Sequence, residues 1–505
     1  MTEKHDRWIL LALASCVLFP SLARRDAWPP DEARYTVVAR NLLQSRELAD
    51  FFVLHLNGGI YPDKPPLYFW AAAAVGALTG SLNAWQARLP SALAGLVTLL
   101  LCYELGRRLV DRRTAFLGAL MLLATPQWVY IAQRVALDML LSMWVVASVL
   151  CHVRALENLD AGRRRRAWWW HASMFACWGS AVLTKGPVGV VVPLLGLLGG
   201  AALKSPWCRL RAIPWLRGLG ILLVVVALWL VPALLLTDGA FATEVLWRQS
   251  AGRMQDSFAH AQPFWYFAQT FPVNFLPWSL VLIGGLVWLW RMRRRAEGGS
   301  DFTARGAAAG CFLGAWLLAV LLFFSCISGK RAVYLMPIYP AAALLAAIVV
   351  GRVFVMWPRA IVRTSQAAAT LAVLVGAGMF VWCSMLDRER SGRGVGEMVR
   401  AAIESGRQVV ACEVHRVEDV LYFADLSRLD EVAPEEAVRL VEEHGERLGI
   451  LTDRKRVEAL AALTGGRLAA VASASIDRRE YVLMGLGSEE EGPTIPTEGP
   501  QETHR

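Results

Sequence analysis

Residues 28–35 read WPPDEARY and residues 61–68 read YPDKPPLY, in the polar stretch that follows the first apolar run of the chain. Acidic side chains, a lysine next to prolines and several tyrosines are thus concentrated where a membrane-spanning segment would meet water. Ionisable groups held at such a place are costly, and they mark functional sites by default. The stretch therefore predicts chemistry at one face of a membrane.

Apolar runs recur along the first three quarters of this chain of 505 residues, which is 56% hydrophobic with a mean hydropathy of +0.41. Runs of roughly 17 to 25 residues are long enough to cross the hydrocarbon core of a bilayer. We expect eleven spans, near residues 8–23, 88–109, 114–131, 136–153, 168–184, 187–203, 215–236, 270–290, 308–327, 333–351 and 366–386. The first run is expected to be a retained anchor, and the short stretch 67–80 a re-entrant or interfacial segment.

Basic residues alternate between successive loops in a way that sets the orientation. With the N-terminus inside, the inside loops hold most of the arginines, among them Arg107, Arg108, Arg112, Arg113, Arg154, Arg209, Arg211, Arg217, Arg352, Arg359 and Arg363. The other short loops carry only one or two basic residues each, which is the positive-inside pattern. The net charge of +10 is therefore mostly a topology signal, and binding to nucleic acid is not expected.

The outward loops of this topology collect the unusual polar residues. These are Asp31, Glu32, Arg34, Tyr35, Tyr61, Asp63 and Lys64 in the first loop, Arg134 and Asp138 in the second, Lys185 in the third, Arg253 and His260 in the fourth, and Lys330, Arg331 and Tyr334 in the fifth. Since all of them fall on one side, we expect them to converge on one water-facing cavity.

Each of these groups also has a purely structural interpretation. Arg134 and Asp138 are spaced to form an ion pair within one helix. Lys185, Lys330 and Arg331 suit anchors that extend from helix ends toward water. The two acids of the first loop suit a helix N-terminus, where the dipole favours negative charge. The functional interpretation depends on the coincidence that every group lies on the same side.

The composition changes after the last expected span. Short β-type runs at 408–412, 448–451 and 479–483 alternate with helical patterns, and Pro434 followed by two glutamates indicates a helix start. This alternation predicts a small soluble α/β domain over residues 389–487, outside the membrane. Residues 1–388 would form the membrane domain, with a first outer loop at 24–87. The Glu-, Pro- and Gly-rich residues 488–505 are typical of a disordered tail.

The polar motifs together resemble those of a known family. The turn at 31–35, the segment Leu56-Asn57-Gly58 and the run at 63–67 are similar to the first outer loop of lipid-linked glycosyltransferases, above all the aminoarabinose transferases of lipid A. Segments 134–138, 183–187, 260–266 and 334–337 resemble later parts of these proteins in the same order. The resemblance covers roughly residues 8–350, and Asp63 replaces the glutamate that the aminoarabinose transferases carry. It implies the GT-C type of membrane fold, with periplasmic interfacial helices and a small soluble C-terminal domain.

Cleavage of a sugar–phosphate bond places negative charge on the departing phosphate, so a catalyst needs fixed cations there and a carboxylate near the nucleophile. Lys64, stiffened by two prolines, suits the phosphate, and Asp31 suits a general base, with Glu32 beside it. Arg34, Tyr35, Tyr61, Arg134, Asp138, Lys185, Lys330, Arg331, Tyr334 and, by the resemblance, Arg253 are expected to bind substrate. Asp63 and His260 are candidate ligands of a divalent metal cation, which would neutralise phosphate charge.

The resemblance implies an integral-membrane glycosyltransferase that uses a polyprenyl-phosphate-linked sugar, such as undecaprenyl-phosphate-sugar, as its donor. The acceptor would be lipid A or another envelope glycolipid or glycan, and the protein would be a monomer of the bacterial inner membrane with its active site facing the periplasm. A protein O-mannosyltransferase acting on protein hydroxyls is one alternative. A secondary transporter is another, although it would place polar groups in broken helices near mid-bilayer.

Overall fold

The computed structural model describes residues 2–237, 239, 241–243, 261–293, 301–353 and 358–486, and it divides into two compact units. The helical unit comprises Met1–Arg25, Val38–His55 and Ile60–Met385. The C-terminal unit comprises Asp26–Val37, Leu56–Gly59 and the chain from Leu386 onward. Two short segments from the first outer loop therefore belong to the same compact unit as the C-terminal part of the chain.

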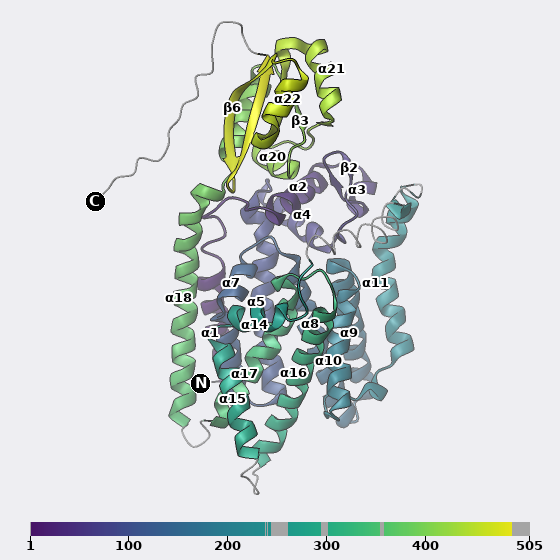
Figure 1. The fold of residues 1–505 in the computed structure, drawn as a ribbon. Coiled ribbons are helices and arrows are strands. Elements are labelled where there is room, and N and C mark those ends of the chain that lie inside the picture. Colours follow the sequence, from purple (N-terminus) through teal and green to yellow (C-terminus); the bar gives the residue numbers. More distant parts are fainter. Residues whose placement is uncertain are drawn as a thin grey trace, which may run out of the picture. The chain divides into compact units, whose positions relative to one another are not determined.

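The helical unit is built almost entirely from helices that run side by side (Figure 1). In chain order these elements are α1 (Glu3–Leu18), α2 (Asp31–Gln44, which starts in the C-terminal unit), α3 (Leu48–Phe52), β1 (His55–Leu56), β2 (Gly59–Ile60), α4 (Leu67–Thr79), α5 (Ala84–Leu109), α6 (Arg112–Leu123), α7 (Pro126–Ala132), α8 (Leu137–Asp160), α9 (Arg164–Lys185), α10 (Val188–Ala202), η1 (Leu210–Ala212), α11 (Trp215–Leu235), α14 (Tyr266–Asn274), α15 (Trp278–Arg293), α16 (Asp301–Cys326), η3 (Ala332–Ile338), α17 (Tyr339–Val353) and α18 (Pro358–Arg390). A helix lies at the position of every expected span.

Six helical segments in the described part of the chain are long and apolar enough to cross a bilayer: α5, α8, α11, α16, η3 with α17, and α18. Helices α6 and α7 meet at 69° and together would make a seventh span. The break falls where Pro126 begins α7, because proline lacks the N–H that would continue the preceding helix. Helices α4 and α10 are apolar but shorter.

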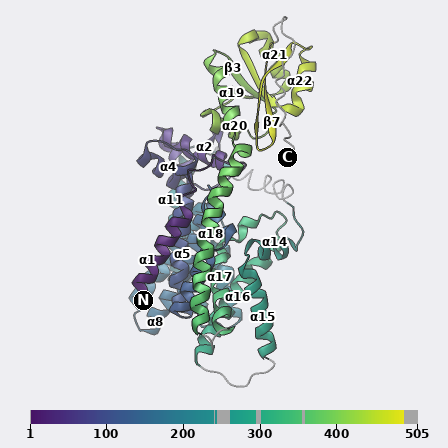
Figure 2. The ribbon, with the colours of Figure 1, turned by 90° about the vertical axis from the view of Figure 1, so that its left-hand side faces the viewer.

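Burial separates central helices from peripheral ones. The apolar window of α8 is 78% buried, whereas those of α11 and α18 are 11% and 17% buried. Helices α11 and α18 therefore present mostly apolar side chains outward, as lipid-facing helices do. Figure 2 shows α18 as one long uninterrupted helix.

Close approach of backbones holds the centre of the helical unit together. Gly106 on α5 faces Leu344 on α17, and a Cβ at residue 106 would lie only 2.4 Å from the leucine Cδ2.

Asp111 caps α6 by accepting the backbone N–H groups of Arg113 and Thr114 at 2.8 and 3.0 Å. Such a cap satisfies donors that the first helical turn leaves without partners.

The C-terminal unit is an α/β domain around a five-stranded sheet. The strands, in the order β4-β3-β5-β7-β6, are β3 (Gln408–Cys412), β4 (Glu431–Val432), β5 (Leu448–Asp453), β6 (Leu468–Ile476) and β7 (Arg479–Leu486). Strand β3 is parallel to β4 and β5, and β7 is antiparallel to β5 and β6. The helical elements are α19 (Arg393–Glu404), α20 (Val417–Ala424), α21 (Pro434–His444), η4 (Gly445–Arg447), η5 (Arg454–Arg456) and α22 (Val457–Leu463).

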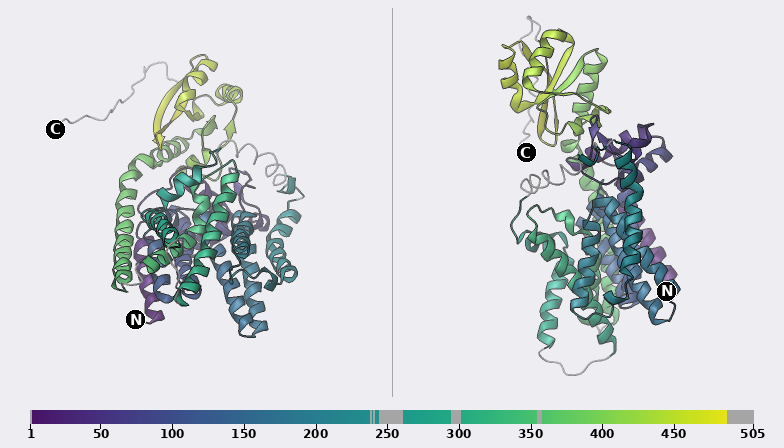
Figure 3. Two further views of the ribbon diagram at one scale, coloured as in Figure 1. Left: turned by 60° about the horizontal axis from the view of Figure 1, so that its bottom comes forward. Right: turned by 90° about the vertical axis from the view of Figure 1, so that its right-hand side faces the viewer.

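Both faces of this sheet are covered by helices, which the views in Figure 3 make visible. Alternate residues of β3 point to opposite faces, so Val409 joins the core under α19 and α20 and Val410 joins the core under α21 and α22. The expected runs at 408–412, 448–451 and 479–483 are strands β3, β5 and β7, and Pro434 is the first residue of α21. The predicted small α/β domain is therefore confirmed. The predicted tail at 488–505 lies outside the described residues.

Candidate functional site

A pocket in the helical unit is formed where α8, α9, α10, α16 and η3 come together. It encloses about 250 Å³ and is lined by Leu141, Lys185, Pro187, Val188, Phe324 and Tyr334. Most of this lining is apolar, and the ammonium group of Lys185 supplies its positive charge. A pocket of this composition suits a ligand that joins an anionic group to a hydrocarbon portion.

Lys185 is the last residue of α9, where the helix dipole favours a cation. The helix stops because Gly186 takes a positive φ of 74°, which places Pro187 at the entrance to α10. The Lys185 ammonium group forms an ion pair with the Asp138 carboxylate at the start of α8. It also lies 4.8 Å from the centre of the Tyr334 ring. Three predicted site residues from three loops are thus brought together.

Tyr334 lies on η3, with its ring centre 5.7 Å from that of Phe324 on α16. The preceding Arg331 is the N-cap residue of η3, and Lys330 is only 5% exposed. The Lys330 ammonium group donates to the backbone carbonyl of Gln262 at 2.7 Å, so it fastens two neighbouring segments of the chain. This contact gives Lys330 a structural partner in addition to its predicted place near substrate.

Arg134 contacts Tyr130, one turn earlier in the chain. Its guanidinium group donates to the Tyr130 hydroxyl at 2.6 Å and lies 5.2 Å from the ring centre. Asp138 has its ion-pair partner on a different helix, Lys185. The ion pair of Asp138 thus links α8 to α9 beside the pocket, whereas the contact of Arg134 stays local to α7 and the connection that follows it.

The run at 61–66 immediately precedes α4. Tyr61 is 5% exposed and meets the ring of Phe69 edge to face, with 6.2 Å between centroids. Its backbone N–H donates to the Leu54 carbonyl at 2.7 Å, which closes a hairpin around β1 and β2. Lys64 is half-buried and Asp63 is exposed. The position of Lys64 on a proline-rich connection fits the predicted fixed cation.

The remaining residues of the first outer loop lie in the C-terminal unit, at the start of α2. The Asp31 carboxylate accepts from the Arg34 guanidinium group at 2.6 Å, one helical turn along. That guanidinium also lies 5.3 Å from the centre of the Tyr35 ring. Both partners of the pair keep some access to solvent, since their side chains are 17% and 26% exposed. Asp31 is thus held in place but stays accessible to solvent.

Glu32 differs from its neighbour, because it is fully buried. Its carboxylate accepts the backbone N–H of Trp28 at 3.0 Å, across Pro29, Pro30 and Asp31. This contact shapes the turn that leads into α2. A catalytic role for Glu32 stays a prediction.

Two predicted site residues, Arg253 and His260, lie outside the described residues. His260 was to share a metal ion with Asp63. In the described ranges, which include Asp63, no three His, Cys, Asp or Glu side chains are grouped as metal ligands. A metal requirement therefore stays a prediction, and only one of its two candidate ligands can be placed.

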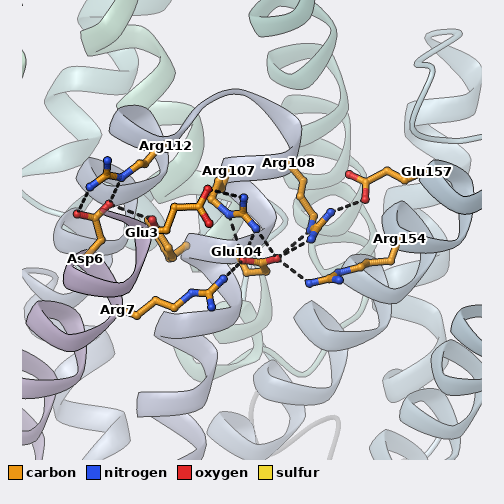
Figure 4. A network of polar contacts seen from close by, with 10 residues as sticks. Glu3, Asp6, Arg7, Glu104, Arg107, Arg108, Arg112, Arg154 and Glu157 are labelled. Carbon is orange, nitrogen blue, oxygen red and sulfur yellow. Dashed lines mark hydrogen bonds and ion pairs between the residues drawn. The ribbon is translucent and has the colours of Figure 1, made fainter. Parts of the chain in front are cut away.

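A second polar cluster joins α1, α5, α6 and α8, toward the end of α8 that is distant from Asp138 (Figure 4). The Glu104 carboxylate, 11% exposed, lies 2.8–3.0 Å from the guanidinium groups of Arg7, Arg107, Arg108 and Arg154. Arg112 pairs with Asp6 and Arg108 with Glu157. Arg107, Arg108, Arg112 and Arg154 belong to the set that indicated the inside loops, whereas Arg7 lies in the first helix. No pattern in the sequence indicated that one acid would contact four arginines.

The fold and these contacts define the chain as a polytopic membrane protein with the GT-C fold. It is similar to a crystal structure of ArnT from Cupriavidus metallidurans bound to undecaprenyl phosphate, with a TM-score of 0.72 and 20% identity, over 95% of this chain and 98% of that one. It is also similar to the oligosaccharyltransferase of Archaeoglobus fulgidus, with a TM-score of 0.56 and 13% identity, over 92% of this chain and 71% of that one. The predicted GT-C fold class is confirmed.

Sequence comparison narrows the resemblance within that class. Residues 63–231 match the family model of the dolichyl-phosphate-mannose-protein mannosyltransferases. The undecaprenyl phosphate-alpha-4-amino-4-deoxy-L-arabinose arabinosyl transferase of Pseudomonas aeruginosa is 31% identical over 348 residues, covering 68% of this chain and 59% of that protein. The undecaprenyl phosphate-alpha-4-amino-4-deoxy-L-arabinose arabinosyl transferase 2 of Proteus mirabilis is 28% identical over 343 residues, covering 67% of this chain and 58% of that protein. This chain thus resembles the aminoarabinose transferases, as its motifs predicted, and it spans somewhat over half of their length.

Proposed function

We propose that this protein transfers a sugar from a polyprenyl-phosphate donor, such as undecaprenyl-phosphate-sugar, to lipid A or another glycolipid or glycan of the cell envelope. The observation that carries the proposal is the pocket in which Lys185 and Tyr334 meet an apolar lining. A phosphate ester of a long isoprenoid chain has the same two-part character. The likeness to the aminoarabinose transferases, in both motifs and fold, adds support.

The reaction is a single displacement at the anomeric carbon. An oxygen of the acceptor forms the new bond to that carbon as the bond from the carbon to the phosphate oxygen breaks, and its electron pair leaves with the polyprenyl phosphate. Cations aimed at the departing phosphate stabilise the charge that develops there. In this proposal Lys64 and Lys185 supply such cations, Arg253 adds to them, and the Tyr334 hydroxyl donates a hydrogen bond.

Asp31 acts as the general base in this scheme. If the acceptor is a hydroxyl, its proton passes to the Asp31 carboxylate as the new bond forms. Proton removal of this kind typically gains about 10²–10⁴-fold in rate. The ion pair with Arg34 holds the carboxylate in one orientation before substrate arrives. A divalent cation bound by Asp63 and His260 would neutralise further phosphate charge.

The site faces the outside of the cytoplasmic membrane in this proposal. Support comes from the distribution of arginines along the sequence, since the Glu104 cluster would then lie on the cytoplasmic side. The protein would act as a monomer in the bacterial inner membrane, with the C-terminal unit in the periplasm.

Transfer of labelled sugar by the purified full-length protein in lipid nanodiscs tests the proposal. We expect transfer from undecaprenyl-phosphate-linked aminoarabinose to lipid A, and a fall of about 10²-fold or more with Asp31→Ala. Asp160→Ala is the matched control, because that aspartate is 64% exposed at the far end of α8. Unchanged transfer by Asp31→Ala would refute the assignment of the base.

The acceptor panel of this experiment separates the alternatives. Transfer to serine or threonine hydroxyls of a peptide, with none to glycolipid, would identify a protein O-glycosyltransferase. Uptake of solute into sealed vesicles without any group transfer would identify a transporter. Either outcome would contradict the proposed acceptor or the proposed reaction.

A further inference from the structure

The segment Asp26–Val37, which carries Asp31, is hydrogen-bonded to Asp387, an acid more than 350 residues further along the chain. One oxygen of Asp387, Oδ1, accepts the backbone N–H of Asp26 at 2.8 Å and the indole N–H of Trp28 at 2.9 Å. All three residues belong to the C-terminal unit. Asp387 therefore fixes both the path of the backbone and the direction of a fully buried tryptophan, three residues before Asp31.

The same short segment has further attachments to the residues that follow Asp387. The Asp26 carboxylate accepts from the Ser391 hydroxyl and forms an ion pair with Arg393 at 2.8 Å. The guanidinium group of Arg390 lies 5.0 Å from the centre of the Trp28 ring. The turn before α2 is thus held through the backbone N–H of Asp26, the carboxylate of Asp26 and the ring of Trp28.

The far end of the segment is fastened by packing. Val37 is fully buried in the core that α19 and α20 form with the sheet, together with Leu421 and Phe423. Burial of this side chain stabilises the attachment, because it removes apolar surface from water. Residues 26–37 are consequently anchored before and after Asp31.

A second piece of the first outer loop is attached in the same way. Asn57 and Gly58, both with positive φ, form the two-residue tip of the β1–β2 hairpin. The Asn57 amide donates to the Glu431 carboxylate at 2.9 Å, and its oxygen accepts the backbone N–H of Leu429 at 2.8 Å. The Leu56-Asn57-Gly58 motif is thus attached to residues 429–431 of the same unit through a side chain that both donates and accepts.

We propose that the C-terminal unit is a positioning element of the transfer reaction, in which Asp387 holds the Asp26–Val37 segment so that Asp31 meets the acceptor in reactive geometry. The inference rests on the proposed function of Asp31 as general base. Asp387 itself touches no substrate, so it is a positioning residue. A displacement of about 1 Å at a reacting group can cost 10²-fold in rate, which gives such a scaffold a measurable effect.

Asp387→Ala and Asp387→Asn form the central pair of variants. Because both hydrogen bonds end on the same oxygen, the asparagine amide oxygen can accept them both, whereas alanine can accept neither. We expect kcat for sugar transfer to fall about 10- to 100-fold with alanine while KM for the donor changes less than about threefold, and we expect asparagine to restore most of the loss. Trp28→Phe removes the indole donor together with part of a buried ring but leaves the bond from Asp26, so it should give an intermediate loss.

A double-mutant cycle distinguishes positioning of Asp31 from a general loss of structure. In the Asp31→Ala background, Asp387→Ala should lower kcat less than about threefold further, because the base that it positions is already missing. Full multiplication of the two losses would overturn the inference. So would equal kcat values for the alanine and wild-type proteins.

Hydrogen exchange of the full-length protein in nanodiscs gives a readout that does not need activity. Amides of residues 26–37 should exchange faster in Asp387→Ala than in Asp387→Asn or the wild type, with the helices of the helical unit unchanged. Unchanged exchange in this segment would overturn the inference even if kcat fell. A wild-type protein that transfers no sugar to any acceptor would instead refute the proposed function, while the exchange result would still report on the anchoring.

Discussion

The two ends of the helical unit handle buried charge in opposite ways. Asp138 and Arg154 lie roughly 24 Å apart along α8, at 1.5 Å per residue. At the Asp138 end, one lysine pairs with one carboxylate beside an open pocket. At the Arg154 end, four arginines surround the carboxylate of Glu104, as Figure 4 shows.

This difference separates charges that stabilise the fold from charges that are available to a ligand. The bonds to Glu104 join α1, α5 and α8, so the cluster connects helices that are distant in sequence. Lys185 instead faces a cavity that an anion could enter. The Lys185 ammonium group would then contact both the Asp138 carboxylate and the bound phosphate. We therefore expect substitutions at the two ends to affect different quantities: catalysis at Lys185 and stability at Glu104.

The largest effect is expected from Lys185→Gln. The amide can still donate to Asp138, but the positive charge beside the departing phosphate is lost, so transfer should fall by about 10²–10³-fold. Sugar transfer and the thermal midpoint should be measured on the same preparation, with the exposed Lys4→Gln as control. If the thermal midpoint fell strongly while activity per folded molecule stayed normal, Lys185 would stabilise the fold and would have no part in catalysis.

Glu104→Gln should lower stability by about 2–4 kcal/mol, because four arginines would lose the charge that compensates them. Glu3→Gln is the matched control, since its carboxylate contacts Arg107 in the same cluster but is 49% exposed, and its loss should cost at most about 1 kcal/mol. Unfolding in detergent checks both variants. Equal stabilities would show that burial does not distinguish these two acids.

A smaller effect is expected from Tyr334→Phe. The ring would keep its contacts with Lys185 and Phe324, and only the hydroxyl would be lost. A hydrogen bond to a charged group contributes about 1.5–3 kcal/mol, so donor affinity or kcat should fall roughly 10- to 100-fold at unchanged stability. Titration with undecaprenyl phosphate would check the binding part. Wild-type affinity together with wild-type kcat would exclude the hydroxyl from the site.

Asp419 in the C-terminal unit extends the comparison to a buried acid with little compensation. It is fully buried, its nearest ion-pair partner is Arg416 at 3.7 Å, and burial, with Glu418 adding to it, raises the pKa of its carboxyl to about 7. Because the folded pKa lies above the unfolded one, the folded state binds the extra proton, and stability is lost as pH rises from about 4 through about 7.

Asp419→Asn should therefore make the C-terminal unit more stable than the wild type at pH 8, by on the order of 1 kcal/mol, and nearly equal to it at pH 4. Hydrogen exchange of β3 and α20 in the full-length protein, measured across this pH range, would check the change. A difference from the wild type that does not vary with pH would contradict it.

Hydropathy and periodicity located the apolar helices and part of the C-terminal sheet, but not α3, β4 or β6. The eleven expected spans coincide with helices, and three expected strands lie in the sheet. These patterns are local, because a run of apolar residues or an alternation of two residues is decided within one element. Pro434 as a helix start is equally local, since its missing N–H needs no partner at the first helical position.

The partners of the charged residues could not be predicted in this way. Arg134 and Asp138 have the spacing of a helical ion pair, yet the described contacts pair Arg134 with Tyr130 and Asp138 with Lys185. Phe324 and Leu141 in the pocket lining carried no signal, because they are ordinary apolar residues of spans. Which side chains share a pocket depends on how the helices pack.

The sequence by itself determined that this chain crosses a membrane repeatedly, that it ends in an α/β domain and that its polar motifs resemble those of lipid-linked glycosyltransferases. Only the tertiary structure decided that Asp31 lies in the same compact unit as Asp387 and that Lys185 joins Tyr334 at a pocket. Backbone propensity and hydropathy act over a few residues and can be recognised in sequence. Contacts between residues hundreds of positions apart depend on the packing of whole elements.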